Sequence, residues 1–319
     1  MKGFSLLLFC AYNLTLVCPV WGEVPTTAKI VFSSFRDDNM EVYIMNPDGT
    51  EPVNLTRNRA ADFDAVWSPT GEQILFVSDR VRERDLYLME PDGSNVRRVF
   101  RKVAHREHPT WSPDGKWIAY QRVEADESWI YTAKIDGTNE EKIVFGHAPA
   151  WSPDGTEIAF VTGKAGHTRI WLFNLQTRRQ KLLLPEDAIP WMWMPAWSPS
   201  GEQLAFAWLN HFPFIGFVHR QTIYIVNRDG TGVKKVVDET GNRANTPVWS
   251  PNGDILLYDQ RPGNNRAQIF KIALGEGEPR QLTHIDWNAP SDWFDPAFAL
   301  PVSPQPQLLT TTWGDVKKR

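Results

Sequence analysis

The sequence predicts an all-β protein, a six-bladed β-propeller, and three observations carry that prediction. The phrase Trp-Ser-Pro-x-Gly occurs five times, apolar strand patterns follow every copy, and the two ends of the chain together supply the parts of one more unit. Successive copies lie 44, 40, 46 and 52 residues apart, which is the period of a four-stranded propeller blade. The copies occupy residues 67–71, 111–115, 151–155, 197–201 and 249–253.

Each copy of the phrase has the chemistry of a turn between two strands. Serine caps the first position of a type I turn, proline fixes φ at the second, and glycine accepts the left-handed conformation that follows. The next residues alternate or run apolar, as in 73–77 and 157–161, which is typical of strands. A third strand, a second turn such as 91–93 and a short polar fourth strand such as 96–100 complete the unit.

The sixth blade is expected to form from both ends of the chain. Residues 29–33, 41–45 and 53–55 have the patterns of strands two to four, and no Trp-Ser-Pro phrase precedes them. We expect the missing first strand at 295–298, near the C-terminus. A blade shared by the two termini would close the ring and remove the open sheet edges that invite aggregation.

The register of this closing strand rests on a comparison with the fourth copy of the Trp-Ser-Pro phrase. Pro296 and Phe298 would take the places of Pro195 and Trp197. A competing register puts residues 302–304 on the Trp-Ser-Pro line. Five or seven blades are the alternatives for the blade count.

The first 22 residues have the layout of a secretory signal peptide: basic Lys2, an apolar middle, and a small-residue cleavage site that ends at Gly22. An uncleaved membrane anchor is the alternative. Both cysteines, Cys10 and Cys18, lie in this segment, so the mature chain would have no disulfide, thiol nucleophile or cysteine-based zinc site. We therefore expect a signal peptide at 1–22, the propeller at 23–301 and a C-terminal tail at 302–319 in a periplasmic or secreted protein.

The charge of the chain limits the classes of partner. Its formal net charge is −4, which gives no reason to expect nucleic acid or an anionic membrane surface. No stretch beyond the signal peptide approaches the length of a membrane span. We expect a monomer with no membrane span after cleavage.

Strand order predicts which face of the propeller carries a binding site. The Pro-Asp-Gly turns share one face, and the connections from strand two to three and from blade to blade share the opposite face. The latter vary in length and chemistry, and variable loops on a rigid scaffold are where function concentrates. Aromatic segments in two of these connections predict a contact surface for a protein or sugar, at Trp191, Trp193, His211, Phe212 and Phe214. The alternative is that these side chains pack on one another and cap the channel.

The residues next to the proline of each first strand are expected near the central channel. We predict that Asp64, His108, His147, Thr246 and Asp295 line it. Such a ring could hold a divalent metal or an acid–base cluster, but no local ligand spacing supports either. We therefore assign no metal, no cofactor and no catalytic residue.

Arginines recur at the end of the second strand, at Arg36, Arg80, Arg122 and Arg261. A ring of guanidinium groups at one mouth of the channel would receive carboxylates from a peptide or an acidic sugar. The alternative is that each pairs with an acidic residue nearby, such as Asp37, Asp85 or Asp259.

The phrase W-S-P-D-G-x-x-I-A-F, followed by I-Y-x-M-x-x-D-G-T, resembles the repeat of the TolB-type (WD-repeat-like) β-propeller family over roughly residues 29–300. The resemblance implies a six-bladed propeller exported to the periplasm. TolB itself carries an N-terminal α/β domain and works with a peptidoglycan-associated lipoprotein, whereas strand patterns here begin a few residues after the predicted signal peptide. The resemblance therefore extends to the propeller and not to the role of TolB.

These observations favour a non-enzymatic binding or scaffold protein of the bacterial envelope. It would engage a protein or peptide over its variable loop face. No G-x-S-x-G nucleophile motif occurs. The alternatives are a carbohydrate-active lyase or hydrolase using the channel His and Asp residues, and a sugar-binding propeller.

Overall fold

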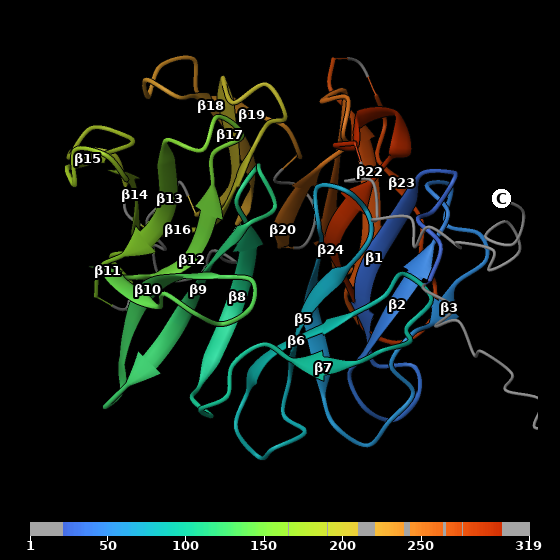
Figure 1. Ribbon diagram of the computed structural model, residues 1–319. Helices are drawn as coiled ribbons and strands as arrows, with labels where there is room; N and C mark the ends of the chain where they lie inside the picture. Colours follow the sequence, from blue (N-terminus) through green and yellow to red (C-terminus); the bar gives the residue numbers. More distant parts are fainter. Residues whose placement is uncertain are drawn as a thin grey trace, which may run out of the picture.

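Six antiparallel sheets of four strands make up the protein in a computed structural model (Figure 1). The structure describes residues 22–164, 166–189, 191–209, 221–238, 243–263, 266–275 and 277–301. Within these ranges every regular element is a strand, apart from one short 3₁₀ turn, η1 (Pro296–Phe298). This confirms the predicted fold class and blade count. Nothing in the described ranges forms a helix of the length and hydropathy that crossing a bilayer requires.

Blades 1 to 5 each use four consecutive strands, and their inner strands lie against one another around the axis. Blade 1 is β4 (Asp62–Trp67), β5 (Ile74–Ser78), β6 (Asp85–Met89) and β7 (Arg97–Arg98); blade 2 is β8 (Arg106–Trp111), β9 (Trp117–Glu124), β10 (Glu127–Lys134) and β11 (Glu141–Phe145). Blade 3 is β12 (His147–Trp151), β13 (Glu157–Thr162), β14 (Arg169–Asn174) and β15 (Gln180–Leu182); blade 4 is β16 (Met192–Trp197), β17 (Gln203–Trp208), β18 (Thr222–Asn227) and β19 (Lys234–Lys235). Blade 5 is β20 (Ala244–Trp249), β21 (Ile255–Gln260), β22 (Gln268–Ala273) and β23 (Arg280–Gln281).

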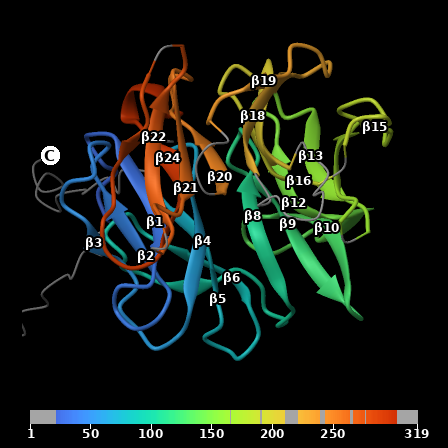
Figure 2. The same ribbon diagram turned by 180° about the vertical axis from the view of Figure 1, so that it is seen from behind.

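Blade 6 combines the two ends of the chain, as expected. Its strands are β24 (Asn288–Phe294), β1 (Lys29–Ser34), β2 (Glu41–Met45) and β3 (Val53–Asn54). Figure 2 shows β24 beside β1, and the inner strand of blade 6 contacts those of blades 5 and 1. The pairing of β24 with β1 therefore completes the sixth blade and closes the ring.

The predicted register of the closing strand is wrong. Trp293 pairs with Ile30 in the way that Trp67 pairs with Ile74, so Trp293 is the sixth copy of the repeated tryptophan. Residues 296–298 form η1 instead, because the Asp295 side chain accepts the backbone N–H of Ala297 and caps the turn. The competing register at 302–304 and the predicted tail at 302–319 lie outside the described residues. Residues 1–21 of the predicted signal peptide at 1–22 do so as well.

Three of the repeated tryptophans join neighbouring blades through their indole N–H groups. The indole N–H of Trp111 donates to Val66 O at 3.3 Å and that of Trp249 to Ala196 O at 3.0 Å, each on the preceding blade. Trp197 bonds to Ala150 O at 3.1 Å in the same way. The hydrophobic core accordingly lies between the blades, and its clusters combine residues of adjacent sheets.

Candidate binding site: the axial channel and its mouth

A β-bulge in each inner strand of blades 1 to 5 shapes the channel. The bulged residues have φ between 48° and 51° and are Asp64, His108, Ala148, Met194 and Thr246. Residues other than glycine seldom adopt this conformation, and bulges commonly redirect a side chain beside a binding site. All five residues line a cavity of about 390 Å³ on the axis.

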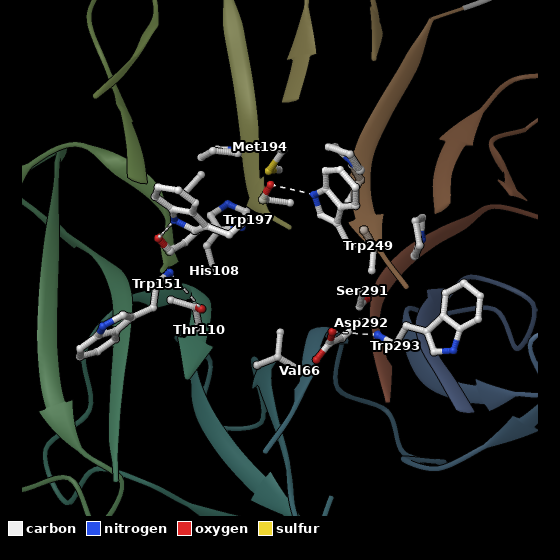
Figure 3. Close-up of a pocket in the computed structure, with 18 of the residues that line it drawn as sticks. Val66, His108, Thr110, Trp151, Met194, Trp197, Trp249, Ser291, Asp292 and Trp293 are labelled. Carbon is white, nitrogen blue, oxygen red and sulfur yellow. Dashed lines mark hydrogen bonds between the residues drawn. The ribbon is translucent and has the colours of Figure 1, made fainter. Parts of the chain in front are cut away.

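This inner cavity extends toward the Trp-Ser-Pro turns. Figure 3 shows its labelled side chains arranged around an open centre, with Trp151 and Trp197 on one side and Asp292 and Ser291 on the other. Most of the wall is proline, alanine and tryptophan. The polar groups are few, so each of them has a strong influence on what the cavity can hold.

A second cavity of about 430 Å³ forms the mouth of the channel on the face that carries the strand-two-to-three loops. It shares Asp64, Met194, Thr246, Pro290 and Ser291 with the inner cavity, so the two are parts of one channel. Its apolar wall is Met40, Phe63, Trp193 and Trp287, and its polar wall is Gln221, Asn245, Asp259 and Arg261. We refer to it as the mouth cavity.

The polar wall of the mouth cavity is a chain of side-chain contacts. The Gln221 amide donates to Asn245 Oδ1, and Asn245 Nδ2 lies 3.4 Å from Asp259 Oδ2. Burial raises the pKa of Asp259, and its Oδ1 has no hydrogen-bond partner within the described part of the chain. A buried polar atom without a partner is costly, and this cost is larger for the charged form of the carboxyl than for the neutral form.

His108 and Asp64 form an ion pair across blades 1 and 2. The Nδ1 of His108 lies 3.0 Å from Asp64 Oδ2. Burial acts to lower the pKa of His108, but the charge of Asp64 and the hydrogen bond to it outweigh burial and raise the pKa above its usual value. The pKa of His147 is lowered, first by burial and then by the charge of His108.

Asp292 brings a second carboxyl group into the inner cavity. Burial raises its pKa to about 6, although its oxygens accept the backbone N–H groups of Trp67 and Trp293. Sequence reasoning missed this residue, because the closing strand was placed too close to the C-terminus. The interval of 44 residues from Trp249 to Trp293, equal to the first interval of the repeat, is the signal that identifies the strand.

The structure brings together three of the five residues predicted to line the channel. Asp64, His108 and Thr246 lie in the cavity walls. His147 begins β12 and belongs to the wall of neither cavity. It lies close enough to His108 for the charge of His108 to lower its pKa. Asp295 follows the closing strand and caps η1, away from both cavities.

The two predicted tryptophans contact each other beside the mouth. The rings of Trp191 and Trp193 meet edge to face with centroids 6.4 Å apart, and both line a groove of about 210 Å³ with Leu209, Gln221 and Arg243. Trp193 also lines the mouth cavity, so the groove and the cavity adjoin. His211, Phe212 and Phe214 lie outside the described residues.

The four predicted arginines occupy different environments. Arg36 donates to Ser34 Oγ and Asn288 Oδ1, Arg80 pairs with Asp62 at 2.9 Å, and Arg122 pairs with Glu140 at 3.0 Å. Arg261 lies in the wall of the mouth cavity. Of the acidic residues expected to pair with them, Asp85 pairs with Arg106 instead, and Asp37 bonds to Tyr43 and Asn54. The charges of Arg36 and Arg261 nevertheless act on Asp37 and Asp259.

The arrangement of charged side chains suits binding better than metal coordination. Across the described ranges, no three histidine or carboxylate side chains are grouped as metal ligands. The channel instead offers an aromatic wall, amide groups and isolated carboxyls, which together can bind the backbone and side chains of a polypeptide or the hydroxyl groups of a sugar.

The fold and the channel define a closed six-bladed propeller whose axial cavity opens among variable loops. The chain belongs to the TolB β-propeller domain family, whose model matches residues 11–147 and 130–296. A search of curated protein sequences finds no significant match.

Several solved structures share the fold. TolB from Acinetobacter baumannii has 19% sequence identity and a TM-score of 0.72, with 83% of this chain and 66% of that protein covered. A putative TolB from Agrobacterium tumefaciens has 18% identity and a TM-score of 0.65, with 83% and 91% covered. An oligogalacturonate lyase from Vibrio parahaemolyticus has 16% identity and a TM-score of 0.51, with 82% and 73% covered.

Proposed function

We propose that the protein is a non-enzymatic scaffold of the bacterial envelope that binds a protein or peptide partner at the mouth cavity. The observation that carries the proposal is the cavity itself, about 430 Å³ in volume and continuous with the inner cavity. Trp193, Phe63 and Trp287 give it the aromatic wall that anchors apolar side chains. The predicted signal peptide and the TolB family support a periplasmic or secreted location.

The polar wall supports a polypeptide ligand. A main chain presents alternating donors and acceptors, and the side chains from Gln221 to Asp259 offer both kinds of group along one side of the cavity. Burial raises the pKa of Asp259, so its carboxyl group ionises less readily than an exposed one.

Photo-crosslinking in cells tests the proposal. A photo-reactive amino acid at Met40, in the mouth cavity, should give a defined adduct with one envelope protein, and the same group at exposed Asp136, on the opposite face, should not. Trp193→Ala should reduce the Met40 adduct because it removes part of the aromatic wall. Equal adducts from both faces, or an adduct insensitive to Trp193→Ala, would contradict the proposal.

A lyase or hydrolase acting on carbohydrate is a second candidate, supported by the His108–Asp64 pair in the channel. The raised pKa of His108 makes it a better candidate for a general acid than for a general base. Release of unsaturated products from polygalacturonate by the wild type, and not by His108→Ala, would favour the enzyme over the scaffold.

A further inference from the structure

Positive charge is concentrated on one part of the loop face. Three segments that border blade 1, residues 55–61, 79–84 and 99–105, contain seven arginines and lysines but two acidic residues. The whole chain, in contrast, has 34 basic and 38 acidic residues. The exposed basic side chains outside ion pairs, which we call the basic surface, are Arg57, Arg59, Arg82, Arg101 and Lys102.

Backbone hydrogen bonds bring the three segments together. Asp79 N donates to Ala61 O at 3.2 Å, and Ala61 N donates to Asp79 Oδ1 at 2.8 Å, so the first segment lies against the loop between β5 and β6. Arg106 N donates to Arg84 O at 2.8 Å, which ties the third segment to the other end of that loop. The basic residues therefore form one surface across the face of blade 1.

Two further arginines fix the backbone beneath this surface. Arg98 donates to Phe100 O at 2.9 Å and to Arg101 O at 3.0 Å, and the buried Arg106 donates to Lys102 O at 3.2 Å. These bonds hold the main chain of residues 100–102. The side chains of Arg101 and Lys102 remain exposed.

Four of the five side chains of the basic surface have no ion-pair partner within the described part of the molecule, and the fifth, Arg57, lies near enough to Asp37 for its charge to act on that carboxyl. Arg80 and Arg84 are paired, with Asp62 and Glu107. No hydrogen bond or ion pair involves the side chains of Arg59, Arg82, Arg101 or Lys102 in the ranges that the structure describes. Unpaired guanidinium groups at this density favour carboxylates as ligands.

Arg82 also occupies a position where the backbone does not favour arginine. Its φ is 71°, and the corresponding loop residues of blades 6 and 2 are Asp38 and Asp126, with φ of 66° and 69°. Aspartate is enriched in this left-handed region, whereas arginine is not. The backbone gives no reason for the positive charge at this position.

The basic surface is continuous with the mouth cavity and includes apolar side chains. Val81 and Val103, next to Arg82 and Lys102, are each 38% exposed. The Arg84 guanidinium lies 5.3 Å from the centroid of Phe63, which lines the mouth cavity. A ligand that covers the surface and reaches the cavity must be narrow and flexible, which favours an extended polypeptide over a lipid bilayer.

We propose that the partner of the loop face contributes an acidic, extended segment that lies on the basic surface of blade 1 and leads into the mouth cavity. This rests on the proposed function and adds the chemistry of the partner. Carboxylates of the segment pair with Arg57, Arg59, Arg82, Arg101 and Lys102, and its apolar residues pack on Val81 and Val103. Such charge complementarity raises association rates and makes them depend on salt.

Fluorescence anisotropy with a labelled peptide of glutamate alternating with serine and leucine tests this proposal on the mature chain. The peptide should bind at low salt, and its affinity should fall as salt rises. The triple variant Arg57→Glu/Arg59→Glu/Arg82→Glu should weaken binding about tenfold or more. A matched control with the same change in charge, Arg179→Glu/Lys181→Glu/Lys234→Glu, uses exposed residues of blades 3 and 4 and should leave affinity within about twofold.

Several outcomes would overturn the proposal: no binding of the acidic peptide, equal binding of its glutamine counterpart, or equal losses in the two triple variants. Binding of phosphatidylglycerol vesicles or polygalacturonate through the same arginines, in place of the peptide, would do so as well. If the Met40 adduct forms and requires Trp193 but survives the Arg57, Arg59 and Arg82 substitutions, the proposed function stands and this inference fails.

Discussion

Asp292, on the last strand of the propeller, holds the backbone of Trp67 in blade 1: its Oδ2 accepts the Trp67 N–H at 2.8 Å. Its Oδ1 accepts the N–H of Trp293, also at 2.8 Å. At the corresponding place in blade 2, the Thr110 hydroxyl accepts the N–H of Trp151 at 3.4 Å. The indole N–H groups of Trp67 and Trp293 have no partner within the described part of the chain. The carboxylate therefore stabilises the interface where the ring closes.

Asp292→Ala should lower the free energy of unfolding by about 2 kcal/mol, because two backbone donors lose a charged acceptor. Urea denaturation of the two proteins measures the difference. Thr110→Ala is the matched control, and its longer hydrogen bond predicts a smaller loss. Equal losses in the two variants would mean that the closing interface has no special dependence on Asp292.

Stability should also respond to pH through Asp292. Its carboxyl titrates at about 6 in the folded protein, against 3.8 as its ordinary value. Between these values the folded protein binds a proton that the unfolded chain has released, so this group makes the protein more stable as pH falls from 7 toward 4. The gain is on the order of 3 kcal/mol at most.

Asp292→Asn, which cannot titrate, isolates this effect. As pH falls through about 6, the unfolding free energy of the wild type should rise relative to that of the variant. Urea denaturation at a series of pH values measures it. A difference independent of pH would show that Asp292 has an ordinary pKa.

The Trp-Ser-Pro turn of blade 1 should be more sensitive to substitution than that of blade 2. Gly71 and Gly115 have φ of 74° and 68°, so alanine at either position carries a similar backbone penalty of about 1–2 kcal/mol. A Cβ at Gly71 would lie 2.2 Å from Cζ of buried Phe294, whereas at Gly115 the nearest atom is 3.6 Å away. Gly71→Ala should therefore cost about 1–3 kcal/mol more than Gly115→Ala in thermal or urea unfolding. Similar costs would contradict the packing of β24 against this turn.

Asp64→Asn should lower the pKa of His108 and raise that of His147, because the first loses its ion pair and the second loses part of a neighbouring positive charge. NMR titration of the imidazole protons measures both, with Asp37→Asn as a control because Asp37 contacts Tyr43 and Asn54 instead.

A raised histidine pKa stabilises the fold at low pH, and this contribution is lost as pH rises through that pKa. The stability difference between wild type and Asp64→Asn should therefore shrink as pH increases. Unchanged histidine titrations would contradict the pair.

Five blades could be predicted because their signals are local. Each Trp-Ser-Pro-x-Gly phrase contains its own turn chemistry, and every phrase lies beside the strands that it connects. The sixth copy lacks this local signal, since Trp293 is followed by Phe294, Asp295 and Pro296 and not by serine, proline and glycine. Its turn differs because β24 leads toward η1 and not into a second strand of its own blade.

The site was harder to predict because it depends on distances between blades. The repeat placed Asp64, His108 and Thr246 beside the proline positions, and a bulge does carry them to the axis. The mouth cavity combines Met40 and Trp287 beside blade 6 with Gln221 beside blade 4, and no spacing in the sequence indicates that they meet. The partner of a long arginine side chain is likewise not encoded in its position, as Arg80 with Asp62 illustrates.

The shared blade sets the order in which the protein can fold. Strands β1 to β3 leave the ribosome first, but β1 cannot pair with β24 until nearly the whole chain has been made, since Ser33 and Ala289 meet across more than 250 residues of sequence. Contacts between residues so far apart in the sequence form slowly, and the edge of β1 can pair wrongly with other strands until β24 is present. Closure of the ring should therefore be a late step in the folding of this propeller, because it must wait for β24.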